Sequence, residues 1–118
     1  MPAGAGSLPR MDTRSLVGPR GVVLEVLVPT TQRERARGLL GRRPVPMLFE
    51  RARSVHTFGM REEIVVAFLD RHHRVIRVTT VPPRRIVWSV RARHVLEMPA
   101  GSSLRRGDRL STAPGASR

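Results

Sequence analysis

The segment His56-Thr57-Phe58-Gly59-Met60 gathers several residue types that can contact a ligand. In an extended chain His56 and Phe58 lie on one face, because side chains alternate with a period of two. Gly59 allows a β-bulge or a close approach of the backbone to a ligand. The interpretation that this pattern favours is a bulged strand that packs Phe58 and Met60 into the core. The alternative is one wall of a small-ligand or peptide pocket with His56 as its polar anchor, and the candidate ligand-binding residues are then His56, Phe58, Gly59, Met60 and Glu97.

General acid–base chemistry has its candidates in Glu97, Asp70 and the adjacent pair Glu62-Glu63. Carboxylates held close together in a poorly solvated site separate their pKa values and can divide the roles of acid and base. The adjacent pair is explained more simply as ion-pair partners of Arg61 and Arg51. Nucleophilic catalysis lacks a candidate, since the chain has no cysteine, no GxSxG elbow and no Ser-x-x-Lys. We therefore predict no catalytic residue.

A metal site would have to draw on the histidines and one aspartate, namely His56, Asp70, His72, His73 and His94. Polar residues 70–74 have the composition of a turn, in which the adjacent side chains of His72 and His73 diverge. His94 shares a strand face with Leu96 and Met98, and Val95 and Glu97 alternate with them, which predicts a partly buried histidine on a strand. We therefore predict neither a metal site nor a cofactor.

The charge of the chain is strongly positive. Its 118 residues include 22 basic and 9 acidic side chains, a net charge of +13, and every basic residue is arginine. Such a charge attracts polyanions, but the absence of lysine indicates a compositional bias, and three Phe and one Trp offer few surfaces for base stacking. We therefore expect non-specific polyanion binding, spread evenly over exposed arginines such as Arg84, Arg85, Arg91, Arg93, Arg105 and Arg106.

The elements that would position these residues are mainly strands. Residues 1–20 and 111–118 are rich in Gly, Pro, Ala and Ser, and we expect them to be a flexible lead-in and tail around one domain, 21–110. Alternation predicts a first strand over 22–28, and a capping box with an apolar stripe predicts a short helix near 31–40. The continuous apolar run 64–69 predicts a strand buried on both faces, paired through the turn at 70–74 with a strand over 75–81. The sequence thus predicts a mainly β fold, a single-domain sandwich or open barrel with one short helix after the first strand.

Six segments occur in an order that is similar to a known family: ERARGLL (34–40), PMLFE (46–50), HTFGM (56–60), AFLDRHHRVIRV (67–78), ARHVLEMPAG (92–101) and RRGDRL (105–110). Together they resemble the prokaryotic family known as domain of unknown function 192. The resemblance implies a compact, mainly β domain with one short helix, and no established catalytic activity. The chain departs from the family pattern where Glu63 and Val65 stand in place of a proline and an aspartate, and where Pro46 replaces the glycine before MLF.

These observations favour a non-enzymatic binding or accessory module whose partner is unknown. The alternatives are a small-ligand enzyme with a site near His56, and a weak nucleic-acid-binding module that uses the arginine-rich surface. The sequence has no apolar run of the length of a signal peptide or a membrane span, so we expect a soluble, cytoplasmic monomer.

Overall fold

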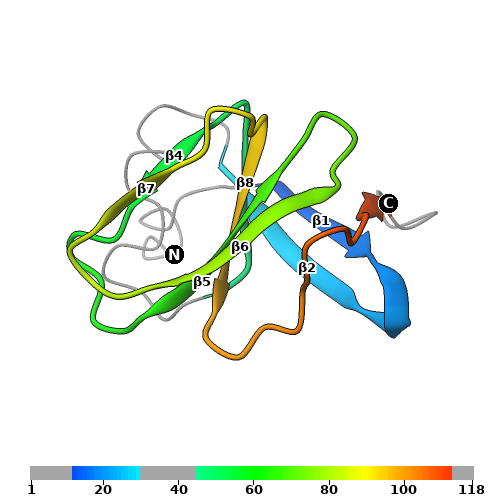
Figure 1. Cartoon of the computed structure of the whole chain (residues 1–118). Helices are drawn as coiled ribbons and strands as arrows, with labels where there is room; N and C mark the ends of the chain where they lie inside the picture. Colours follow the sequence, from blue (N-terminus) through cyan, green and yellow to red (C-terminus); the bar gives the residue numbers. More distant parts are fainter. Residues whose placement is uncertain (1–11, 30–44, 113–118) are drawn as a thin grey trace, which may run out of the picture.

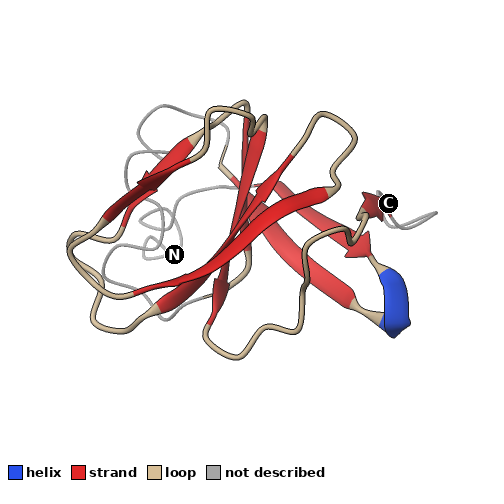
Figure 2. Ribbon diagram, in the orientation of Figure 1, coloured by secondary structure: helices blue, strands red, loops and turns tan. Residues whose placement is uncertain are grey.

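The computed structural model describes residues 12–29 and 45–112. In these ranges the backbone forms strands separated by loops and a single 3-10 turn (Figures 1 and 2). The elements are β1 (Asp12–Val17), η2 (Pro19–Gly21), β2 (Val23–Val28), β3 (Met47–Glu50), β4 (Ser54–His56), β5 (Ile64–Leu69), β6 (Val75–Val81), β7 (Ile86–Trp88), β8 (His94–Pro99) and β9 (Ser111–Thr112).

Seven strands form one curled sheet in the order β6-β5-β8-β3-β2-β1-β9. All neighbours are antiparallel except β2 and β3, which are parallel. The curl brings the start of β6 against the segment that precedes β9, where the Val75 N–H donates to the Asp108 carbonyl (2.7 Å) and the Leu110 N–H donates to the His73 carbonyl (3.0 Å). The expected mainly β fold is therefore confirmed, and the large sheet has the form of an open barrel.

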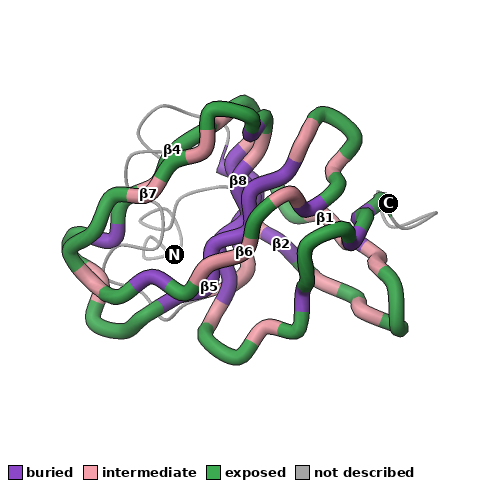
Figure 3. Tube along the Cα trace, in the orientation of Figure 1, coloured by how far each residue is buried: buried purple, intermediate pink, exposed green. Residues whose placement is uncertain are grey.

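The inside of the curl is filled by an apolar cluster to which most strands contribute. Strand β5 supplies Val65, Ala67 and Leu69, and the loop after β8 supplies Leu104. All six residues of β5 are buried (Figure 3), because its other three side chains, Ile64, Val66 and Phe68, belong to a second cluster on the opposite face of the sheet. The prediction of a strand buried on both faces is confirmed.

A separate two-stranded sheet of β4 and β7 packs over that second cluster (Figure 1, left of the view). Val55 and Val87 are paired across the two strands and both pack against the cluster. Their neighbours in the strands point away from the core, since side chains alternate along each strand. The molecule therefore has two layers on this side, as in a sandwich.

Strand β1 lies inside the segment that the sequence analysis assigned to a flexible lead-in. Asp12–Val17 pairs along its whole length with β2, and Leu16 is 2% exposed. The segment has too few apolar residues to indicate a strand by itself, so its order comes from pairing with a strand that is already formed. At the other boundary, the first two residues of the predicted tail, Ser111 and Thr112, form β9 against β1. The predicted helix near 31–40 lies outside the described residues.

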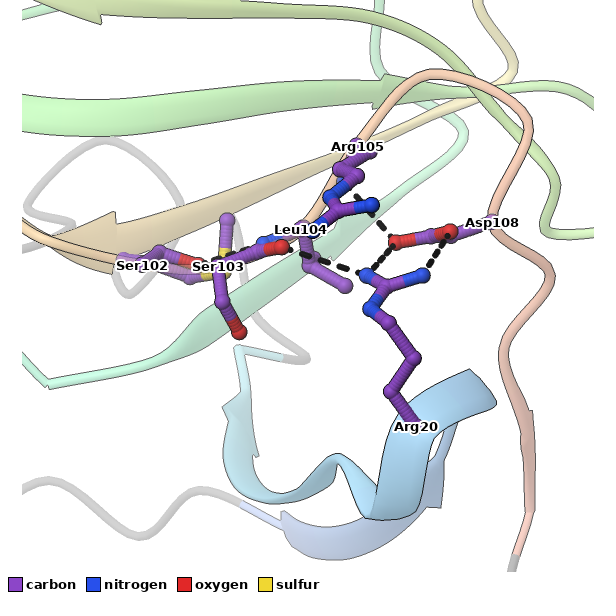
Figure 4. A network of polar contacts seen from close by, with 7 residues as sticks. Arg20, Ser102, Ser103, Leu104, Arg105 and Asp108 are labelled. Carbon is purple, nitrogen blue, oxygen red and sulfur yellow. Dashed lines mark hydrogen bonds and ion pairs between the residues drawn. The ribbon is translucent and has the colours of Figure 1, made fainter.

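The hairpin between β1 and β2 is attached to the loop before β9 by an ion pair (Figure 4). The Arg20 guanidinium donates to both carboxylate oxygens of Asp108, at 3.0 and 2.7 Å, and to the Ser103 carbonyl at 3.2 Å. The Arg105 N–H donates to the same carboxylate (2.8 Å). These hydrogen bonds, those of Arg20 first, hold the pKa of Asp108 below its ordinary value although burial opposes the shift.

Candidate functional site

Three loops meet at one end of the large sheet because of the register of its strands. Glu50 at the end of β3 and Leu69 at the end of β5 both pair with His94 at the start of β8. The loops 51–53, 70–74 and 89–93 continue from these strand ends, along the top edge of the view in Figure 1. Two backbone hydrogen bonds join loops 51–53 and 89–93, from the Ala52 N–H to the Arg93 carbonyl (3.1 Å) and from the Ser89 N–H to the Arg53 carbonyl (2.9 Å).

These three loops carry six exposed arginines, which we call the basic end: Arg51, Arg53, Arg71, Arg74, Arg91 and Arg93. Four of them line a hollow of about 570 Å³ together with His94. The other two, Arg74 and Arg91, line a second hollow of about 640 Å³ with Arg77 and Arg106. Each hollow is lined by residues of loops 70–74 and 89–93, so the positive charge is continuous across this end of the sheet.

Asp70 is the acidic residue of the basic end, and its carboxylate is used to shape a turn. One oxygen accepts the backbone N–H groups of His72 (2.8 Å) and Arg74 (3.0 Å). Burial raises the pKa of Asp70, but these two hydrogen bonds outweigh that effect and lower it overall. The carboxylate thus fixes the loop that presents Arg71 and Arg74 to solvent.

His94, which lines the first hollow, stacks on a second histidine. The rings of His73 and His94 are stacked, with centroids 4.5 Å apart and planes inclined by 8°, and His73 adopts a positive φ of 63° in the turn. Burial lowers the pKa of both imidazoles. The neutral form of His94 accepts a hydrogen bond at Nδ1 from the Arg51 N–H (3.2 Å), so the pair is a packing element that fixes the position of Arg51.

The predicted ligand wall at His56, Phe58, Gly59 and Met60 does not form one surface with Glu97. His56 and Phe58 are exposed, and their rings lie 5.7 Å apart on the outer side of β4. Gly59 has a φ of 86° in a turn, where glycine is favoured, and Met60 packs against the second apolar cluster. Met60 packs on the core as the favoured interpretation expects, but the expected bulged strand is not observed, because β4 ends at His56 and a turn follows it. Phe58 lies in that turn, is 48% exposed and is not a core residue.

Glu97 lies in the second apolar cluster. Its direct neighbours on the adjacent strands are Met47 and Val66, both buried. The residue is 4% exposed, and the ion pairs among the described residues join other groups, Arg14 to Glu50 and Arg20 to Asp108. Burial raises the pKa of the Glu97 carboxyl to about 8, so the group is mainly protonated at neutral pH.

One residue that the sequence analysis did not select, Thr57, fixes the loop after β4. Its hydroxyl donates to the Pro82 carbonyl (2.7 Å) and accepts the Arg85 N–H (2.9 Å). Its backbone N–H donates to the Arg85 carbonyl (2.8 Å), and its carbonyl accepts the Arg84 N–H (3.2 Å). A threonine within a polar-aromatic segment gives no pattern that would reveal this role, since its partners are about 25 residues away.

Among the described residues, no three or more His, Cys, Asp or Glu side chains come together in a group that could hold a metal ion. Within the same part of the chain, no helix is long and apolar enough to cross a membrane.

Comparison with known proteins gives matches of sequence and of fold. The family model DUF192, described as an uncharacterised ACR, matches residues 15–112. A UPF0127 protein of Pyrococcus horikoshii is 38% identical over 85 residues, which cover 65% of this chain and 74% of that protein.

Two solved structures have the same fold. One is a protein of unknown function from Novosphingobium aromaticivorans (TM-score 0.72, 19% identity, covering 86% of this chain and 84% of that one). The other is a Sinorhizobium meliloti protein named as a candidate transcription regulator (TM-score 0.75, 21% identity, covering 90% and 98%). At these identities the likeness shows the fold alone.

Proposed function

The chain belongs to the uncharacterised DUF192 family, and we propose that it is a non-enzymatic module that binds the phosphate backbone of a nucleic acid through its basic end. The observation that carries the proposal is the convergence of arginines from three separate loops on one end of the sheet. We also propose that the module acts in the cytoplasm and that it is a monomer.

The number of arginines and their placement have different causes. Because the chain uses no lysine, composition contributes to the number. Composition does not bring Arg51, Arg71 and Arg93 from distant parts of the sequence to line one hollow, which depends on the register of β3, β5 and β8. This clustering supports a binding surface rather than an evenly charged one.

The guanidinium groups of the basic end are available to an anion. The ion pairs of the described residues join Arg14 to Glu50 and Arg20 to Asp108, so they use none of the six arginines, although the Arg71 Nε–H donates to His72 Nε2 (3.2 Å). Arginine donates paired hydrogen bonds in a planar fork that matches phosphate oxygens. Contacts of this kind hold a nucleic acid without reading its sequence.

The geometry gives little support to the enzymatic alternative. A general acid or base must come within hydrogen-bond reach of the reacting group. His56 faces solvent on the outer side of the β4–β7 sheet, whereas Glu97 lies in the apolar cluster beneath that sheet. The two residues therefore lack a common surface on which a substrate would meet both.

Affinity measurements on single arginine variants test the proposal. We expect Arg71→Ala and Arg93→Ala each to weaken binding of a labelled oligonucleotide in fluorescence anisotropy titrations at fixed salt. Arg61→Ala is the matched control, because Arg61 is also exposed and precedes β5 at the opposite end of that strand. Equal effects of all three variants would show that the charge acts diffusely and would contradict the proposal.

A further inference from the structure

The outer face of the β4–β7 sheet exposes large apolar side chains. Trp88 is 61% exposed, Ile86 56% and Phe58 48%. In the strand pairing His56 lies opposite Ile86, and Ser54 lies opposite Trp88. We call His56, Phe58, Ile86 and Trp88 the aromatic face. Its exposure follows from the alternation of the ribbon, whose inward residues Val55 and Val87 pack on the core.

The aromatic residues of the chain are divided between two environments. Of the three phenylalanines and one tryptophan, Phe49 and Phe68 are buried, and both of the others lie on the aromatic face. Apolar side chains that are exposed together on one surface commonly mark an interaction site, whereas single exposed apolar residues do not. The small number of aromatic residues therefore does not exclude base stacking, because half of them are on one accessible surface.

The aromatic face is held in a fixed position. The two strands that carry it are joined beyond His56 by the four hydrogen bonds of Thr57 to Pro82, Arg84 and Arg85. At the other end, the Ser89 N–H donates to the Arg53 carbonyl (2.9 Å). A surface fixed in this way loses little conformational entropy when a ligand binds.

The aromatic face is continuous with the basic end. An Arg77 guanidinium N–H donates to the Trp88 carbonyl (3.2 Å), and Ser89, the next residue, lines the second basic hollow with Arg91. At its far end the ribbon is followed by the exposed Arg84 and Arg85. Positive charge thus flanks the aromatic side chains at both ends of the ribbon.

Flat apolar side chains that are flanked by cationic groups suit one class of ligand. Single-stranded nucleic acids bind through phosphates on basic groups and through unpaired bases on aromatic rings, whereas a duplex keeps its bases stacked internally. We propose that the aromatic face stacks the bases of a single-stranded nucleic acid whose phosphates lie on the basic end. This inference rests on the proposed function and adds the preference for single strands.

Trp88 is the sole tryptophan of the chain, so its fluorescence reports on this face alone. We expect an oligothymidylate to quench it, because stacking brings a base against the indole ring. Inorganic polyphosphate is the control ligand, since it carries the charge without bases and is expected to bind with little quenching. Quenching that is equal for the two polymers would overturn the inference.

Variants separate the two proposals. We expect Trp88→Ala to weaken oligothymidylate binding ~5- to 150-fold, the range of one stacked base, and to leave duplex binding unchanged, with partial rescue by Trp88→Phe. Val23→Ala, at an equally exposed valine of β2, is the control. The contrary result is that Trp88→Ala binds single strands as tightly as the unmodified chain does while Arg93→Ala weakens the binding of both single strands and duplexes. In that case the aromatic face serves another partner, such as a protein, and the inference about single strands is wrong although the proposed function stands. If neither nucleic acid nor polyphosphate binds at physiological salt, the proposed function fails as well.

Discussion

The buried carboxyl of Glu97 makes the stability of this domain fall as the pH rises from 4.5 to about 8. Its pKa rises on folding from an ordinary value of 4.5 to about 8 through burial, so the folded state holds a proton that the unfolded chain has released. The resulting stability is fully present below pH 4.5 and is lost as the pH rises through 8. Ionising the carboxyl in the folded state therefore costs about 5 kcal/mol more than ionising it in the unfolded chain. This difference is a large part of the free energy of unfolding of a domain of this size.

Between pH 6.5 and 9 this linkage predicts a loss of about 2 kcal/mol. The chain has no lysine, cysteine or tyrosine to titrate in this window, and burial lowers the pKa of His73 and His94. Glu97→Gln retains the shape of the side chain without its charge. We expect the variant to lose the fall in stability that the wild type shows between pH 6.5 and about 8, and to become the more stable protein at pH 9.

Urea unfolding followed by Trp88 fluorescence at pH 6.5, 7.5, 8.5 and 9 measures this dependence. Glu25→Gln is the control, since Glu25 is an exposed acid of β2. A wild-type stability that is flat over this range, or the same slope in Glu97→Gln, would refute the assignment of the proton to Glu97.

Two further predictions concern the core and the ion pair of Figure 4. Phe68→Ala is expected to cost about 3–5 kcal/mol in chemical denaturation, because Phe68 is fully buried between the two layers; a loss below about 1 kcal/mol would contradict the packing. Arg20→Met is expected to lower the midpoint of thermal unfolding more than Arg14→Met does. The first variant leaves the carboxylate of Asp108, which is only 7% exposed, without its guanidinium partner, whereas both side chains of the Arg14–Glu50 pair are partly exposed to water. Equal midpoints for the two variants would show that the Arg20 contact contributes no more than a surface pair.

Local patterns in the sequence were sufficient to predict several elements. The apolar run of β5, the turn at 70–74 and the end of β6 before Pro82-Pro83 are all observed. The two faces of β8 are also as expected, with Leu96 and Met98 in one cluster and Glu97 towards the other. These features depend on residues close together in the chain, where alternation and turn composition carry the information.

The features that local patterns missed depend on contacts between distant segments. Strand β1 is mostly polar and is ordered by pairing with β2. The stack of His73 on His94 needs the β5–β6 turn to meet the start of β8. The basic end likewise exists only through the strand register, and alternation alone could not show that Trp88 belongs to the uncovered face of a second sheet.

The salt dependence of nucleic-acid binding tests the central claim most directly. Each phosphate neutralised on a duplex contributes about 0.9 to the slope of log affinity against log salt concentration. If the basic end holds the backbone, the double variant Arg71→Ala/Arg93→Ala has a slope that is shallower by about 2 than that of the unmodified chain, and Arg61→Ala leaves the slope unchanged. A slope that is the same in all three proteins would contradict the claim that the arginines of the basic end bind phosphate.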